Sequence, residues 1–200
     1  MKPLFLASQP GLDFLNTTFA VLPTSTTAEL IGDGAAFLGW LVEAELLDRP
    51  TASRLRRRAG GDTLDEVAAE ARAFRHWARD WIARWREHPG GAYGPELRRL
   101  NELLQRGSCY REIVAASGHW TAREHPRIEA PRELIALVAW QVARIFTDEA
   151  PELVKRCAGT GCVLWFVDRT KAHRRLFCSP TACGNRAKVA AFRERQREPR

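Results

Sequence analysis

Long hydrophobic runs are absent from this sequence. No stretch approaches the roughly 18 apolar residues that a membrane-spanning helix needs, which excludes a membrane protein. The apolar run at the N-terminus is too short for a signal peptide, because Gln9, Pro10 and Asp13 interrupt it. We therefore expect a cytoplasmic protein whose thiols stay reduced.

Cysteine is scarce in the first three quarters of the chain, where Cys109 stands alone. The other four cysteines form two pairs, Cys157-x4-Cys162 and Cys178-x4-Cys183, with fifteen residues between the pairs. Each pair can bend into a tight loop that presents two thiolates, and the segment between them can fold back to bring the loops together. This pattern predicts a structural Zn²⁺ site with these four cysteines as its ligands.

Two other interpretations of the paired cysteines remain open. The four could form two disulfides, although a reducing compartment disfavours them. His173 lies between the pairs and could replace one sulfur as a ligand. Cys109 has no cysteine partner nearby, and we expect a half-buried residue rather than a nucleophile.

Catalytic motifs are lacking as well. The histidines of the first 150 residues form no motif with a nearby carboxylate. A zinc site with four cysteine ligands is closed and leaves no coordination position for water. We therefore do not expect an enzyme.

Acidic residues are sparse near the C-terminus. Residues 152–200 hold 12 Lys and Arg side chains against 4 Asp and Glu, a net charge of +8, whereas the whole chain carries +7. The preceding residues are therefore close to neutral. A concentrated basic segment after a nearly neutral one indicates a polyanionic partner such as DNA.

Hydrophobic periodicity predicts a helical domain over residues 1–150. Apolar residues recur at helical spacing in five segments: 33–47, 51–58, 64–87, 95–105 and 131–146. Asp33 is the expected N-cap of the first segment, and Thr63 with Glu66 forms a capping-box pattern before the third. Alternating apolar residues on both sides of Ser117-Gly118 predict a short β-hairpin.

Three tryptophans stand four residues apart in the longest of these helices, at Trp77, Trp81 and Trp85. A stripe of this kind lies on one helix face, and it is more often core than a ligand site. We therefore assign the stripe to the core of the helical domain.

The pair Ala150-Pro151 is the predicted domain boundary, because it ends a helix and coincides with the change in charge. Within residues 151–200, strands are predicted at 163–167 and 174–177 and a helix at 183–195. This order of loop, hairpin, second loop and helix is treble-clef-like. The predicted fold is thus mainly α with a small β-hairpin, a helical N-terminal domain followed by a treble-clef-like zinc finger.

The predicted C-terminal helix has two different faces. Val189 and Phe192 fall on one side, and Ala187, Ala190 and Ala191 fall opposite, between two ridges of Arg and Lys. One prediction is that the apolar pair packs inward, so that the alanine face approaches a nucleic-acid groove and the ridges meet phosphates. The other is that the alanines pack on the zinc loop and the apolar pair docks on the helical domain.

The motif Cys178-x4-Cys183-Gly184-Asn185-Arg186 resembles the CGNR zinc-finger family, and Trp165-Phe166 fits the same pattern. Phe177 stands where a Trp is expected. Residues 12–17, Leu-Asp-Phe-Leu-Asn-Thr, resemble the opening of the ABATE domain that accompanies this finger in bacteria. Members of the family are regarded as transcription regulators. The resemblance implies metal ligation by the four paired cysteines and DNA contact through the finger.

These observations predict a zinc-binding, DNA-binding transcription regulator whose helical domain senses a small-molecule effector or forms a homodimer. The candidate nucleic-acid contacts are polar side chains of the finger: Arg174, Arg175, Asn185, Arg186, Lys188, Arg193 and Arg195. The alternative is a zinc-braced protein-interaction or RNA-binding module. In that case Trp165 and Phe166 could stack on bases if they were exposed.

Three polar residues interrupt the apolar N-terminal stretch, namely Asp13, Asn16 and Thr17. Such residues can cap a turn or helix and satisfy the local backbone. They could instead line a small-molecule pocket, with Asp13 and Asn16 as polar contacts. Both interpretations remain open at this point.

Overall fold

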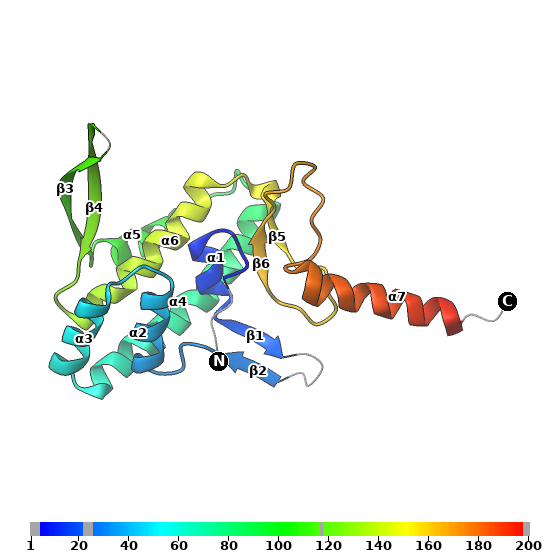
Figure 1. Ribbon diagram of the computed structural model, residues 1–200, viewed down its shortest axis with the longest axis horizontal. Helices are drawn as coiled ribbons and strands as arrows, with labels where there is room; N and C mark the ends of the chain where they lie inside the picture. The colour runs from blue at the N-terminus through cyan, green and yellow to red at the C-terminus, as the bar shows by residue number, and fades with distance from the viewer. Residues whose placement is uncertain (1–4, 22–25, 117, 198–200) are drawn as a thin grey trace. The chain divides into compact units, whose positions relative to one another are not determined.

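The computed structural model describes residues 5–21, 26–116 and 118–197 (Figure 1). It confirms the predicted fold class, mainly α-helical with small antiparallel sheets and a C-terminal cysteine-rich finger. The chain divides into two compact units. Unit 1 holds Met1–Leu30, Arg75–Gly91 and Arg144–Arg200, and unit 2 holds Ile31–Phe74 and Ala92–Ala143. Among the described residues, no helix combines the length and the apolar character that crossing a membrane requires.

Unit 2 combines helices with a β-hairpin. Its helical elements are α2 (Gly34–Glu43), α3 (Arg49–Arg58), α5 (Gly94–Leu104), η1 (Pro131–Glu133) and the N-terminal parts of α4 (Gly61–Glu87) and α6 (Leu134–Asp148). The hairpin pairs β3 (Ser108–Ala116) with β4 (His119–Arg127). The predicted hairpin is therefore confirmed, and Ser117 of its predicted turn lies outside the described residues.

Side-chain caps begin the first two helices of unit 2. The carboxylate of Asp33 accepts a hydrogen bond from the backbone N–H of Ala36 at 2.7 Å, which confirms the predicted N-cap of α2. Asp48 accepts in the same way from the N–H of Thr51 at 2.7 Å, at the start of α3. Each cap satisfies a backbone donor that the first helical turn leaves without an intrahelical partner.

The C-terminus of α2 comes four residues before the predicted end at Leu47. The N–H of Leu46 donates to the carbonyl of Leu41, and the N–H of Glu45 donates to that of Val42. This pair of bonds is a Schellman motif, which closes a helix through a residue in the left-handed conformation. Glu45 occupies that position with φ of 59°, where glycine is the usual residue.

The N-terminus of α4 also differs from the prediction. The helix begins at Gly61, so Thr63 lies within its first turn and the predicted capping box is wrong. Asp65 accepts a hydrogen bond from the N–H of Gly34 at 2.7 Å, which joins α4 to the start of α2. A Cβ on Gly34 would lie 2.3 Å from the Cβ of Leu64, so this close approach requires glycine.

Unit 1 combines N-terminal residues with the cysteine-rich finger. Its elements are α1 (Pro10–Leu15), β1 (Thr18–Val21), β2 (Thr26–Glu29), the C-terminal parts of α4 and α6, η2 (Pro151–Leu153), β5 (Val154–Arg156), β6 (Trp165–Val167), the π-helical turn η3 (Pro180–Gly184) and α7 (Asn185–Arg197). The antiparallel β1–β2 pair was not predicted from the sequence.

The tryptophan stripe of α4 packs in the core of unit 1, as predicted. Trp81 stacks on Phe146 of α6 with ring centroids 4.0 Å apart, and Trp85 meets the same ring edge-on at 5.0 Å. Both indoles are buried, and Trp77 lies beside Trp81 at 5.3 Å.

One of the two strands predicted in the finger is present. β6 forms within the predicted segment 163–167 and pairs with β5. The segment 174–177 is not a strand, and that prediction is wrong. Its backbone makes irregular bonds: the N–H of Arg175 donates to the carboxylate of Asp168, and the carbonyl of Leu176 accepts from Ala158. These partners hold the segment in an irregular loop, without the regular backbone pairing of a β-strand.

Candidate metal centre and nucleic-acid surface

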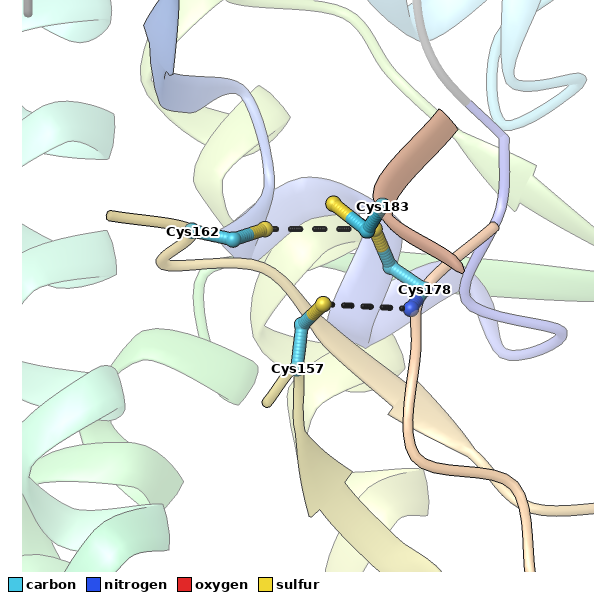
Figure 2. A group of neighbouring side chains, drawn as sticks. All are labelled: Cys157, Cys162, Cys178 and Cys183. Carbon is cyan, nitrogen blue, oxygen red and sulfur yellow. Dashed lines mark hydrogen bonds between the residues drawn. The ribbon is translucent and has the colours of Figure 1, made fainter. Parts of the chain in front are cut away.

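The structure gathers the four paired cysteines from two segments (Figure 2). Cys157 follows β5 and Cys162 lies in the loop before β6, whereas Cys178 precedes η3 and Cys183 lies within it. Their sulfur atoms all lie within 4.8 Å of one another, and Cys157, Cys178 and Cys183 are buried. This group is called the sulfur cluster below.

The spacing of the sulfur cluster fits a tetrahedral zinc ion. Four sulfurs at about 2.3 Å from zinc would lie about 3.8 Å from one another. The sulfur of Cys178 lies 3.8 Å from that of Cys162 and 3.5 Å from that of Cys183. These separations far exceed the S–S bond of about 2 Å in a disulfide. The disulfide alternative is therefore wrong.

Two further residues considered from the sequence, a histidine and a fifth cysteine, lie outside the sulfur cluster. His173 is not part of the sulfur cluster, and its Nδ1 lies 3.3 Å from the carbonyl oxygen of Asp168. Cys109 is exposed on β3 rather than half-buried as predicted.

Polar hydrogens around the sulfur cluster point at its sulfurs. The sulfur of Cys157 accepts from the backbone N–H groups of Gly159 at 3.4 Å and Cys178 at 3.3 Å. The guanidinium of Arg186 donates to the sulfur of Cys183 at 2.9 Å. Such donors stabilise thiolates and orient them, as outer-shell partners of metal ligands do.

The thiols of the cluster compete for negative charge. The hydrogen bond that Cys178 supplies lowers the pKa of Cys162 to about 5. The same hydrogen bond, together with burial, raises the pKa of Cys178 well above its ordinary value. Four thiolates in this space need a compensating cation. The donor set fits Zn²⁺, which would hold the two loops together and contribute stability to the finger.

Asp168 organises the loop that precedes Cys178. Its buried carboxylate accepts from Lys155 at 2.7 Å, from the hydroxyl of Thr170 at 2.6 Å and from the N–H of Arg175 at 2.8 Å. Burial alone would raise the pKa of Asp168, but the hydrogen bonds from Lys155, Thr170 and Arg175 hold this pKa well below its usual range. Sequence reasoning did not identify this network.

Arg175 is part of the same loop and is bonded within the finger. Its guanidinium lies 4.2 Å from the centroid of the Phe166 ring and donates to the carbonyls of Phe177 at 2.9 Å and Leu6 at 3.2 Å. These contacts engage much of the guanidinium, but Arg175 is only partly buried and lines the same groove as Arg174 and Lys188. Its contact with nucleic acid stays a prediction.

The other predicted contacts lie on the surface of the finger. Arg174 and Lys188 line a groove of about 630 Å³ between the loop and the start of α7. Asn185, Arg186, Arg193 and Arg195 are exposed along α7. Arg186 is also bonded to the sulfur cluster, so it links the metal centre to the basic surface.

The faces of α7 differ from both predictions. Val189 and Phe192 are 41% and 57% exposed, so the predicted inward packing is wrong, and so is their predicted docking on the helical domain. Ala187 is half-buried and lines the groove beside Phe177, whereas Ala190 and Ala191 are exposed, so the alanine face packs on the finger only at its first residue. Trp165 and Phe166 are buried, so they cannot stack on bases.

The candidate ligand residues near the N-terminus are bonded within unit 1. The amide of Asn16 donates to the carbonyl of Trp165 at 2.8 Å and accepts from its N–H at 2.9 Å. The hydroxyl of Thr17 donates to the carbonyl of Phe14 and accepts from Arg75, and Asp13 accepts from the N–H of Ala7. These bonds support the structural interpretation, and the ligand interpretation remains a hypothesis.

Arg79 also connects the N-terminal residues of unit 1 to the finger. Its guanidinium donates to the carbonyl of Leu15 at 2.7 Å and to that of Val163 in the finger. Burial lowers the pKa of Arg79 to about 10, which still leaves the side chain charged at neutral pH. Sequence reasoning missed this residue, because nothing in its local pattern marks a partner that lies far along the chain.

Comparison with known families decides the relationship. Residues 8–149 match the model of the ABATE family, which is described as a "putative stress-induced transcription regulator". The chain belongs to the ABATE family. Residues 154–196 match the CGNR zinc finger, so both predicted resemblances are confirmed. No curated protein matches the chain. The ABATE match includes the Asp13–Thr17 segment, and the CGNR match includes the whole sulfur cluster.

The sulfur cluster predicts metal content. We expect the full chain to hold one equivalent of zinc, measured by elemental analysis after gel filtration. Cys183→Ser removes one thiolate from a closed site, so we expect it to lose most of the zinc and to melt at a lower temperature. Cys109→Ser is the matched control and should keep the full equivalent, because this thiol lies outside the cluster. Full zinc content in Cys183→Ser would contradict the assignment.

Asp13 predicts a pH dependence of stability. Burial raises its pKa to about 6, against the opposing hydrogen bonds of Ala7 and Leu6. A raised pKa means that its contribution to stability is complete below the unfolded pKa and is lost as the pH rises through about 6. Asp13→Asn keeps an acceptor for Ala7 and cannot ionise.

The measurement is the free energy of unfolding in denaturant for both proteins. From about pH 5 to about pH 7.5, we expect wild type to lose about 1–2 kcal/mol more than Asp13→Asn. Parallel curves for the two proteins would show that Asp13 does not titrate in this range.

Proposed function

We propose that the chain is a zinc-dependent, DNA-binding transcription regulator. The observation that supports this most is the junction between the sulfur cluster and the basic helix. Cys183 lies in η3, which leads directly into α7, and Arg186 in the first turn of α7 bonds to the Cys183 sulfur. Zinc held by Cys157, Cys162, Cys178 and Cys183 would therefore fix the start of the helix that exposes the basic side chains.

We assign the two proposed roles to two segments of the sequence. Residues 151–200 bind DNA, and residues 1–150 sense a small-molecule effector or form a homodimer. A dimer would compensate for the small DNA surface that one short finger covers. The proposal places the protein in the cytoplasm and assigns it no reaction, in keeping with the regulator and zinc-finger descriptions of the two families.

Electrostatics would supply most of the affinity. Arg174 and Lys188 face the same groove at the base of α7, and Arg193 and Arg195 continue the positive charge along the helix. Lys and Arg contacts to phosphates release counterions, so binding weakens as salt increases. Asn185 has an amide that can pair with a base edge, and Arg186 has further N–H donors besides the one that bonds to the Cys183 sulfur.

A second candidate is a protein-interaction module braced by the same zinc. The exposure of Val189 and Phe192 on α7 favours it, because two apolar side chains on one face of a helix suit a partner groove. The RNA-binding alternative is not favoured, since Trp165 and Phe166, the residues expected to stack on bases, are buried.

The first experiment is selection of bound sequences from a random duplex pool with the zinc-loaded full chain. We expect one motif to be enriched and chelation to abolish the enrichment. Replacing Lys188 and Arg193 with Ala should weaken binding to all sequences and reduce the slope of log K against log salt by about one per lost phosphate contact.

Arg57→Ala together with Arg58→Ala is the matched control, since it removes the same charge from α3. DNA affinity that survives both chelation and the Lys188 and Arg193 changes would contradict the proposal. Loss of a protein partner on Phe192→Ala, with no DNA binding in any arm, would favour the interaction module.

A further inference from the structure

Unit 2 contains a cavity whose lining includes none of the candidate site residues. Its volume is about 500 Å³, within the range of about 300–1,000 Å³ typical of small-molecule sites. Its walls are formed by the turn that follows α2, the end of α5, the base of the β3–β4 hairpin and one face of α6. It is called the unit 2 cavity below, and its lining includes Glu45, Leu104, Cys109, Glu124, Leu137 and Trp140.

The charged residues that line the unit 2 cavity have one sign. Its described lining residues include two carboxylates, Glu45 and Glu124, and no lysine, arginine or histidine. This is notable in a chain with a net charge of +7. Glu124 also pairs with Arg111 on the neighbouring strand at 3.3 Å, but both side chains are exposed, and exposed pairs of this kind are weak. The cavity therefore suits a ligand with positive charge.

The remaining walls are mainly apolar and include an accessible indole. Trp140 is 52% exposed although its neighbours Val138 and Ala139 on α6 are buried. An indole face attracts cations, and it also packs well against aromatic groups. An apolar body with a positive charge would satisfy both the indole and the carboxylates.

The backbone at Glu45 gives an independent observation. Glu45 closes α2 in the left-handed conformation with φ of 59°, where glycine would fit without strain. A residue with a Cβ is disfavoured there, and strained backbone tends to occur at functional sites. The residue in this conformation is also one of the two acidic residues that line the cavity.

We propose that the unit 2 cavity binds a lipophilic organic cation and is the effector site of the ABATE region. The ligand class is a molecule with an aromatic or aliphatic body and a delocalised or ammonium charge. The assignment as an effector site rests on the proposed DNA-binding function, whereas the binding of the cation does not.

The test uses two probes of nearly the same size and shape but opposite charge, tetraphenylphosphonium and tetraphenylborate. Each is titrated into the zinc-loaded full chain without DNA and followed by calorimetry. We expect the cation to bind at least about tenfold more tightly than the anion, despite the positive net charge of the protein. Equal or tighter binding of tetraphenylborate would overturn the proposal.

Variants locate the binding to the cavity. We expect Glu45→Gln and Glu124→Gln each to weaken cation binding about three- to fivefold and Trp140→Ala about tenfold. Glu112→Gln and Trp120→Ala are matched controls, because they remove a carboxylate and an exposed indole outside the lining. Bound cation should also slow alkylation of the Cys109 thiol. Affinity unchanged in all three lining variants would overturn the proposal.

Glu45→Gly separates a ligand role from a folding role. Glycine relieves the left-handed strain, so we expect the melting temperature of this variant to stay the same or rise while cation affinity falls as in Glu45→Gln. A variant that melts lower and binds the cation as wild type does would show that Glu45 serves the fold alone and would overturn its assignment.

DNA is added only after these titrations. If the cation binds as expected and changes the affinity for the selected DNA motif, the effector assignment is supported. If the cation binds and the DNA affinity does not change, the effector assignment is wrong. If no DNA binds under any condition, the proposed function fails, whereas the titrations have already decided the cavity.

Discussion

The finger depends on one electrostatic constraint, the repulsion among four thiolates. Their sulfur atoms all lie within 4.8 Å of one another. Three of the cysteines are buried, and they share a small core with Leu164 and Phe166. This core is small, so hydrophobic burial within it contributes little to holding the two cysteine loops together. A divalent cation would convert the repulsion among the thiolates into the main attraction that joins the two loops.

The features that sequence reasoning predicted well depend on local patterns. Cysteine spacing marked the sulfur cluster, because each pair forms its own short loop. Asp33 was recognisable as an N-cap, since capping involves residues only three positions apart. The helices after residue 33 and the β3–β4 hairpin followed from periodicity and from turn residues, whereas α1 was not predicted. Each of these signals is contained in a few neighbouring residues.

The features that it missed depend on partners far along the chain. Asn16 pairs with Trp165 across 149 positions, and no local pattern in either segment indicates this. The segment 174–177 has the composition of a strand, but the carboxylate of Asp168 takes its backbone donor at Arg175. Val189 and Phe192 were assigned to a core because apolar pairs on helices usually bury, yet they are exposed on α7.

The long-range bonds of unit 1 also affect how the two family matches should be understood. The ABATE match ends at residue 149 and the CGNR match begins at residue 154, but unit 1 includes residues from both. Asn16 and Arg79, from the ABATE region, bond to the backbone of the finger at Trp165 and Val163. The predicted boundary at Ala150-Pro151 stays a prediction about sequence segments, and the physical unit does not follow it.

A closed site of four sulfurs limits where regulation can act. Such a site has no open position for an effector, so a signal that reaches the finger through binding must originate elsewhere in the chain. The two kinds of charge lie in different parts of the chain. The basic residues concentrate after residue 151, whereas carboxylates line the unit 2 cavity. A polyanion and an organic cation would therefore occupy different surfaces without competing for the same charges. Reciprocal coupling between them would require in addition that each ligand binds one of two states of the protein more tightly.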